Sequence, residues 1–248
     1  MKILLTNDDG IESPGLQALL DVLGNDHEVW IVAPDRERSG TSHSITLHEA
    51  VRFRPLGERR FACGGTPADC VLFSVLGAVP VRPDLVVSGI NLGPNLGTDI
   101  IYSATVAAAR QAALMGLASV AVSVTGVRTP FYFDAAALFV ARNAETVAKM
   151  WKGDHFLNIN VPNQPGADLP VTITHPSRRT YRDKLSSFVA PNKDTYHFLQ
   201  SVPAEAEADP GSDWEAVTAG SISVSPIYLH PVNHVDYLAY EEVEFRLQ

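Results

Sequence analysis

The sequence contains almost no cysteine. Cys63 and Cys70 are the only two among 248 residues, and they do not form a CxxC pair. Two thiols in a chain of this size favour a reducing compartment over an oxidising one. We therefore expect both side chains to be buried as small apolar groups.

The sequence also lacks an excess of basic residues. It has 19 Lys and Arg against 28 Asp and Glu, which gives a formal net charge of −9. A general nucleic-acid binder usually presents a basic face, so we expect no binding to a nucleic-acid duplex. A small anionic substrate is compatible with this charge, because a metal ion and a few backbone N–H groups make a local positive site.

Long apolar runs are missing as well. No stretch approaches the length of a membrane span, and acidic residues interrupt the first apolar run by position 8. We therefore expect neither a signal peptide nor a membrane partner, and we expect the protein to be cytoplasmic.

Several common motifs of nucleotide-binding and hydrolytic enzymes are absent. There is no GxxxxGK[ST] for a P-loop, and no GxGxxG follows the first expected strand. GxSxG and HExxH are missing too. These absences exclude a P-loop and argue against a dinucleotide fold of the usual kind.

What the chain does have is an alternation of strand-like and helix-like segments in its first half. Hydrophobic residues make up 46% of the sequence, which is ordinary for a globular protein. The alternation predicts an α/β fold, a three-layer α/β/α arrangement with a mainly parallel, Rossmann-like sheet. Strands are expected at 3–6, 27–33, 45–47, 51–55, 60–63, 84–89, 119–125 and 156–161. Helices are expected at 14–23, 67–76, 104–115 and 131–151.

The second half is less regular. Pro162, Pro165 and Pro170 break the chain after the expected last strand of the core sheet. Further strands are expected at 171–175 and 221–227, with a helix within the final residues. Residues 178–200 mix polar and aromatic side chains without a clear period, which is typical of an arm that packs on another subunit. We expect a single domain over 1–248, with its core at about 1–161 and a C-terminal arm and tail at about 162–248.

Two adjacent acids stand at the end of the first expected strand. Asp8 and Asp9 repel each other unless a cation lies between them. Ligands of open α/β sheets bind just beyond the carboxyl ends of the strands. A hard divalent cation meets this need; the alternative is a polar turn that caps the helix beginning at Pro14.

Three polar loops follow expected strands, at 7–10, 39–44 and 91–99. In a parallel sheet, these loops gather at one edge and supply two carboxylates, several hydroxyls and two asparagines. Such an all-oxygen set suits Mg²⁺, Mn²⁺ or Ca²⁺ rather than Zn²⁺. The sequence therefore predicts a divalent-metal site.

Four segments of the first half resemble one known family. NDDGIESPG, VAPDRERSGTSHSITL, GTPADC and SGINLGPNLGTDIIYSATVAAAR are similar to segments of the SurE family, in order and at similar spacing, over most of residues 1–125. Members of this family are stationary-phase survival proteins that act as metal-dependent nucleotidases. The resemblance implies one divalent cation per subunit, Mg²⁺ or Mn²⁺. The metal ligands that it implies are Asp8, Asp9, Ser39 and Asn91.

The resemblance also implies an activity. Family members are phosphatases that prefer nucleoside monophosphates, and some also cleave polyphosphate. We therefore expect hydrolysis of nucleoside monophosphates by metal-activated water, with Asp8 and Asp9 in the catalytic role. The alternative is a nucleotide-sensing protein without turnover, but the intact ligand set favours the enzyme. Family members exchange C-terminal segments between subunits, which implies a homodimer or homotetramer here.

Five further residues are expected to bind the phosphate of the substrate. Gly40 and Thr41 let backbone N–H groups approach an anion. Asn95, Ser103 and Thr105 precede or open the alanine-rich helix, whose N-terminus favours a phosphate. The alternatives are a turn role for Asn95 and helix capping for Ser103 and Thr105.

Three details qualify the resemblance. His43 is left outside the catalytic set, because a histidine in a polar loop is more often only hydrogen-bonded. Ala104 replaces the glycine that the family commonly has, and its methyl group narrows the anion site if the backbone there needs a positive φ. A basic cluster surrounds Tyr181, either as a guide for phosphate-rich substrates or, as we favour, as part of a solvated arm. Its members are Arg178, Arg179, Arg182 and Lys184.

Overall fold

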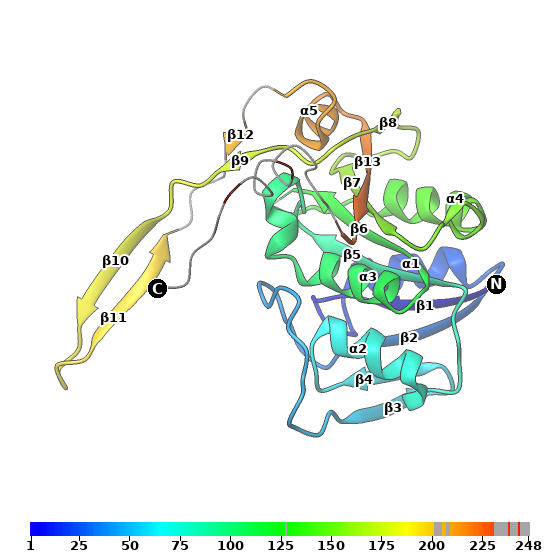
Figure 1. The fold of residues 1–248 in the computed structure, drawn as a ribbon, viewed down its shortest axis with the longest axis horizontal. Helices are drawn as coiled ribbons and strands as arrows, with labels where there is room; N and C mark the ends of the chain where they lie inside the picture. The colour runs from blue at the N-terminus through cyan, green and yellow to red at the C-terminus, as the bar shows by residue number, and fades with distance from the viewer. Residues whose placement is uncertain (127, 201–204, 207–208, 231–237, 239–242, 244–248) are drawn as a thin grey trace.

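The computed structural model describes residues 1–248 except 127, 201–204, 207–208, 231–237, 239–242 and 244–248. A nine-stranded sheet with helices on both faces forms its centre (Figure 1). The strands of this sheet, in chain order, are β1 (Lys2–Thr6), β2 (Glu28–Pro34), β3 (Phe53–Gly57), β4 (Arg60–Cys63), β5 (Leu85–Leu92), β6 (Ala118–Thr125), β7 (His155–Pro162), β8 (Val171–Ile173) and β13 (Ile222–Tyr228).

Six neighbouring strands of the sheet run parallel. The spatial order is β3-β4-β2-β1-β5-β6-β7-β13-β8, and each neighbouring pair from β4 to β7 is parallel. β3 pairs antiparallel with β4, β13 pairs antiparallel with β7, and β8 runs parallel to β13. The predicted α/β fold with a mainly parallel sheet is confirmed.

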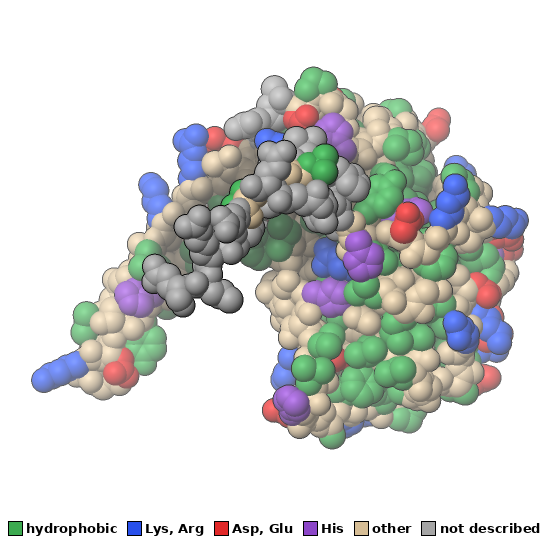
Figure 2. All heavy atoms as spheres, viewed as in Figure 1, with side chains coloured by type: hydrophobic (Ala, Val, Ile, Leu, Met, Phe, Trp, Pro, Cys, Tyr) green, Lys and Arg blue, Asp and Glu red, His purple; other side chains and the backbone are tan. Residues whose placement is uncertain are grey.

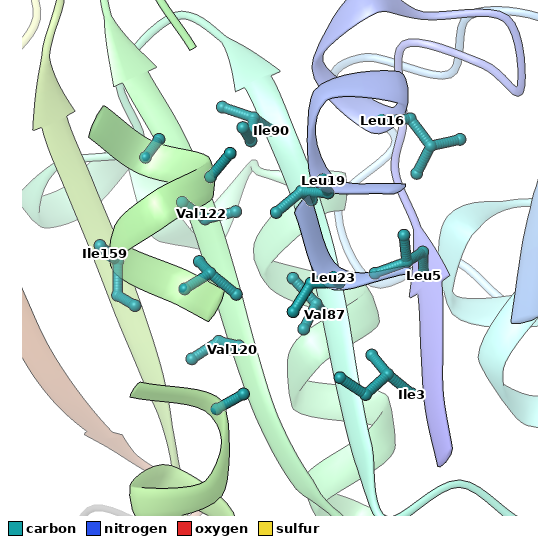
Figure 3. Close-up of a cluster of buried hydrophobic side chains, with 14 of the residues drawn as sticks. Ile3, Leu5, Leu16, Leu19, Leu23, Val87, Ile90, Val120, Val122 and Ile159 are labelled. Carbon is teal, nitrogen blue, oxygen red and sulfur yellow. The ribbon is translucent and has the colours of Figure 1, made fainter. Parts of the chain in front are cut away.

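Two long helices cover one face of the sheet, and two others cover the opposite face. α1 (Pro14–Leu23) and α4 (Asp134–Met150) pack on the face that carries Ile3 and Leu5. Figure 3 shows Leu19 and Leu23 of α1 beside Val87 of β5. α2 (Pro67–Phe73) and α3 (Ala104–Leu114) pack on the face that carries Leu4. Because both faces are buried, β1 needs a continuous apolar run rather than an alternating one.

The helix starts follow from their capping residues. The hydroxyl of Ser13 accepts from Leu16 N at 3.3 Å, and Pro14 is the first residue of α1. Thr66 and Asp69 form a reciprocal capping box at α2. The expected bounds of α1 are those observed, because both of its ends carry local signals.

Several expected elements differ in the structure. Residues 45–47 form no strand, because the Asp69 carboxylate accepts from the backbone N–H of Thr46 at 2.8 Å and from its hydroxyl at 2.7 Å. The expectation that 156–161 is the last strand of the core sheet is wrong, since β13 and β8 lie beyond β7. α4 starts at Asp134 rather than at 131, and a π-helix (Ser74–Ala78) follows α2.

The part of the chain after β8 contributes shorter elements. These are β9 (Arg179–Thr180), β10 (Lys184–Val189), β11 (Thr195–Gln200), β12 (Glu205–Ala206) and α5 (Asp213–Thr218). β10 and β11 form an antiparallel hairpin that extends away from the body of the molecule (Figure 1). The helix expected within the final residues lies outside the described residues.

One expectation from composition, the burial of both cysteines, is met in the described part of the chain. Cys63 and Cys70 are both buried and free. No helix among the described residues is long and apolar enough to cross a membrane.

A candidate metal and phosphate site

The carboxyl ends of three adjacent strands bring the polar loops together. β1 lies between β2 and β5, with Leu5 opposite Ile31 and Thr6 opposite Ser88. The acid pair follows β1, the loop at 35–44 follows β2, and Asn91 lies near the end of β5. The three loops therefore share one edge of the sheet, as expected.

Asp8 is held in a fixed orientation. Its side chain is 4% exposed, and its Oδ1 accepts from the hydroxyl of Thr105 at 2.5 Å. Its backbone oxygen accepts from Arg38 N at 2.8 Å, which joins the β1 loop to the β2 loop. Asp8 thereby connects these loops to the beginning of α3.

Asp9 is more open than Asp8 and faces the loop after β5. Its Oδ2 accepts a weak hydrogen bond from Leu92 N at 3.4 Å. Burial and the neighbouring Asp8 carboxylate raise the pKa of Asp9 to about 6. Burial also raises the pKa of Asp8, although the bond from Thr105 opposes this change. Two carboxylates with raised pKa values at one site indicate a place where a cation is needed.

Ser39 and Asn91 provide neutral oxygens near the acids. Ser39 and Asp9 both line a cavity of about 520 Å³. The Ser39 hydroxyl donates to the Glu37 carboxylate at 3.0 Å. The amide nitrogen of Asn91 donates to Gly93 O at 2.8 Å, so its carbonyl oxygen is the atom that suits a cation.

A local irregularity of β5 sets the position of Asn91. The register with β6 shifts between Ser88 and Asn91. Gly89 has a φ of +140°, and a Cβ atom at this residue would lie 2.2 Å from Val122 O. Glycine is therefore required here, and Asn91 directly follows the register shift, next to Leu92, whose N–H reaches Asp9.

The beginning of α3 completes the site. The hydroxyl of Ser103 accepts from Val106 N at 3.1 Å, which is the capping role that the sequence left open. Thr105 is fully buried against Asp8. Ala104 is the first residue of α3, and φ is not positive there, so the methyl group introduces no backbone strain. A helix N-terminus beside two acids can hold a phosphate once a cation offsets their charge.

Asn95 lies in a buried network beneath this edge. Its backbone N–H donates to Asn160 Oδ1 at 2.9 Å, and its amide nitrogen donates to Ser123 Oγ at 2.8 Å. Its backbone oxygen accepts from Asn158 and Asn160. These bonds fix the loop that leads to α3, and a phosphate-binding role for Asn95 stays a prediction.

The loop after β2 contains Gly40 and Thr41, two of the residues expected to bind the phosphate. Gly40 has a φ of +70° and is exposed. The Thr41 hydroxyl donates to Arg38 O at 2.9 Å, so the hydroxyl is used within the loop. The backbone N–H groups of these two residues are therefore the candidate donors, which stays a prediction. His43 pairs with Gln111 at 2.9 Å, and burial lowers its pKa, in agreement with a hydrogen-bonded role.

Two contacts of the site were not expected from the sequence. One is the bond from Thr105 to Asp8, and the other is the capture of Thr46 by the buried Asp69. Both join residues far apart in the chain. The only local signal was the capping-box pattern at Thr66 and Asp69, which does not show that Asp69 also binds a loop.

The donor set fits a hard cation. Among the described residues, no group of three or more His, Cys, Asp or Glu side chains is placed to hold a metal ion. The edge instead offers two carboxylates with hydroxyl and amide oxygens, which suit an oxygen-loving divalent cation that keeps water ligands. A larger cavity of about 900 Å³ is lined mainly by apolar residues of α4, β7 and β13, and the two acids in its lining, Asp154 and Asp168, are not adjacent in the chain as Asp8 and Asp9 are.

Comparisons with known proteins agree with this geometry. The model of the family described as "Survival protein SurE" matches residues 3–183. The chain is 43% identical over 236 residues to the 5'-nucleotidase SurE of Citrifermentans bemidjiense, covering 94% of this chain and 95% of that protein. It is 40% identical over 240 residues to the 5'-nucleotidase SurE of Heliobacterium modesticaldum, covering 94% and 88%.

A solved structure shows the same fold. The crystal structure of the SurE protein from Aquifex aeolicus matches with a TM-score of 0.84 and 34% sequence identity. The match covers 98% of this chain and 100% of that one. The similarity therefore extends over the sheet, the helices and the segments that follow β7.

Proposed function

This chain belongs to the SurE family, and from that premise we propose that it is a metal-dependent 5′-nucleotidase. It is a phosphoric monoester hydrolase that releases phosphate from nucleoside monophosphates. The observation that carries this conclusion is the contact between Thr105 and Asp8, since it joins the acid pair to a helix N-terminus. A cation site and an anion site at one edge are what hydrolysis of a phosphate ester requires.

Asp8, Asp9, Ser39 and Asn91 would hold the metal. The raised pKa of Asp9 and the bond that leaves the Asn91 carbonyl available support this assignment. A divalent cation, when bound, neutralises phosphoryl oxygens and lowers the pKa of a water. We propose Mg²⁺ or Mn²⁺, one per subunit, because the donors are hard oxygens.

The residues around the metal ligands orient the substrate. Thr105 holds one oxygen of Asp8 and so fixes the direction of its other oxygen. The first turn of α3, opened by Ser103, presents backbone N–H groups to the phosphate, and Gly40 and Thr41 add donors from the facing loop.

We further propose one domain over residues 1–248 in the cytoplasm. β8 and β13 complete the central sheet, so the tail is part of the same unit. The two free, buried thiols of Cys63 and Cys70 are consistent with a reducing compartment.

We also propose a homo-oligomer formed through the hairpin of β10 and β11. The hairpin leaves large apolar side chains exposed, and Figure 2 shows hydrophobic groups along it, away from the body. These side chains are Leu185, Phe188, Val189, Tyr196, Phe198 and Leu199. The simplest way to bury these side chains is contact with a second copy of the chain, in a homodimer or homotetramer.

The activity has a direct test. Phosphate release from nucleoside 5′-monophosphates by the purified protein should need Mg²⁺ or Mn²⁺ and should stop in EDTA. Asp8→Asn and Asp9→Asn should each lower kcat/KM by about a hundredfold or more, since each removes a ligand charge. Asp26 is an exposed acid before β2, at the opposite edge of the sheet, so the control variant Asp26→Asn should keep the wild-type kcat/KM. Near-wild-type turnover in both site variants would refute the assignment. Nucleotide binding without turnover would favour the sensing alternative, which the relatives' activity does not favour.

A further inference from the structure

An exposed aromatic side chain lies directly beside the candidate phosphate site. Tyr102 precedes Ser103, the N-cap of α3, and its side chain is 60% exposed. Its backbone oxygen accepts from Ser42 N at 3.1 Å, and the Ser42 hydroxyl donates to Ile101 O at 2.6 Å. Tyr102 therefore sits where the loop carrying Ser39 meets the beginning of α3.

The ring of Tyr102 is supported from one side. Tyr181 packs against it edge-on, with ring centroids 6.3 Å apart and an interplanar angle of 89°. The Tyr181 hydroxyl donates to Asp99, and the Arg179 guanidinium pairs with the same carboxylate at 2.5 Å. Arg179 in turn lies 4.9 Å above the Trp214 ring. This chain of contacts ties the segment before β10 to the 3₁₀ helix (Gly97–Ile101) that directly precedes Tyr102.

The support of Tyr102 is stable over the working pH range. Burial and the Asp99 carboxylate raise the pKa of Tyr181 above its usual value, so the hydroxyl stays protonated and keeps donating. Tyr102 nevertheless stays 60% exposed, so part of its ring is open to a ligand. An aromatic surface held in one place loses little conformational entropy when a flat ligand binds to it.

We propose that Tyr102 is the residue on which the base of the nucleotide stacks, with Tyr181 positioning its ring. The inference rests on the proposed function, because only a ribose separates the base from a phosphate bound at Ser103 and Thr105. Stacking on an aromatic ring is favourable for every base, since each has a π-face. The site therefore recognises nucleotides as a class, and all four bases gain from the same residue.

The test compares substrates with and without a base. Tyr102→Ala should raise KM for nucleoside 5′-monophosphates about tenfold or more, the loss expected for one stacked base. Its kinetics with ribose 5-phosphate, which keeps the sugar and the phosphate, should equal those of the wild type. Tyr102→Phe keeps the ring and should behave as the wild type with both substrates. Tyr228→Ala is the matched control, because Tyr228 is 58% exposed on β13.

Tyr181 has its own test as a positioning residue. Tyr181→Ala should raise KM for nucleotides by a smaller factor than Tyr102→Ala, with kcat and the reaction of ribose 5-phosphate unchanged. Tyr181→Phe keeps the edge contact and should restore most of the affinity. An equal loss for both substrates would assign these residues to phosphate binding or folding and overturn the inference.

Failure of the proposed function gives a different result. If the wild type hydrolyses neither substrate, calorimetric binding of a nucleoside monophosphate and of ribose 5-phosphate makes the same comparison without turnover. Tyr102→Ala should then weaken the binding of the nucleoside monophosphate and leave the binding of ribose 5-phosphate unchanged. Unchanged nucleotide affinity or KM in Tyr102→Ala refutes stacking, whatever the activity of the protein.

Discussion

Single residues at the acid pair determine how the metal-free protein responds to pH. The pKa of Asp9 is about 6 in the folded protein, whereas the ordinary pKa of this carboxyl is 3.8. The folded state thus binds more protons than the unfolded state between these two values. Stability of the metal-free protein should therefore fall as the pH rises through this window and stay lower above it.

Asp9→Asn should remove this loss. In EDTA at pH 7.5, the variant should melt at a higher temperature than the wild type, because the repulsion with Asp8 is gone. The difference should shrink as the pH falls to 4, where the wild-type carboxyl is protonated. Thermal unfolding of both proteins at the two pH values measures this difference in melting temperature. An equal difference at pH 7.5 and pH 4 would contradict the explanation by charge repulsion between Asp8 and Asp9.

Thr105 offers a second prediction at this scale, since it acts on a proposed ligand through one hydroxyl. Thr105→Val leaves a buried oxygen of Asp8 without its donor and should weaken Mn²⁺ binding about 10- to 100-fold. Thr105→Ser keeps the donor and should bind like the wild type. Thr146→Val, on the exposed side of α4, controls for the change of residue type. Calorimetric titration with Mn²⁺ decides; wild-type affinity in Thr105→Val would mean that the bond is only structural.

At the scale of elements, the sequence predicts those helices and strands whose ends are set by capping or turn residues nearby in the chain. α1 has Ser13 and Pro14 at its start and Gly24 at its end, and its bounds were predicted without error. The sequence of Ile45–Leu47 is typical of a strand. In the structure, however, Thr46 in this segment donates to the Asp69 carboxylate, and the segment does not pair with another strand. β13 joins β7 across more than fifty residues of sequence, a pairing that no local pattern specifies.

The same division applies to the candidate site. The acids after β1 could be predicted because a short apolar strand ends directly before them. Their contact with Thr105 could not, since 97 residues separate Asp8 from Thr105 and only the parallel sheet brings them together. The contacts of Asn95 could not be predicted either: its backbone groups bind Asn158 and Asn160, its amide nitrogen binds Ser123, and its role toward phosphate stays a prediction.

The packing of α1 on β5 gives a prediction about an element. A Cβ atom at Gly15 would lie 2.1 Å from Ile90 O, so α1 approaches β5 more closely than any larger residue permits. Gly15→Ala should destabilise the protein by about 1–3 kcal/mol, the usual cost of overpacking. Gly57→Ala, where the nearest atom is 3.9 Å away, should change stability little. Urea unfolding compares the two; equal midpoints would show that α1 shifts without cost.

At the scale of the whole molecule, the projecting hairpin predicts assembly. Each large apolar side chain that becomes fully buried contributes about 1.5–3 kcal/mol. The protein should therefore be at least dimeric at micromolar concentration in light scattering. Replacing Phe188 and Phe198, whose rings stack 5.9 Å apart, with serine should lower the oligomeric state and leave the metal site intact. A wild-type monomer would refute this reading of the hairpin.

The contacts of Arg179 and Tyr181 with Asp99 have a consequence for the assembled protein. They lie between the hairpin, which we propose as the subunit contact, and the ring of Tyr102, which we propose as the base site. We therefore expect subunit association and nucleotide binding to favour the same arrangement of one short segment. On these two proposals, thermodynamic reciprocity predicts that subunit association and nucleotide binding strengthen each other by the same factor. Dilution into monomers should weaken nucleotide binding, and saturating nucleotide should lower the concentration at which subunits separate.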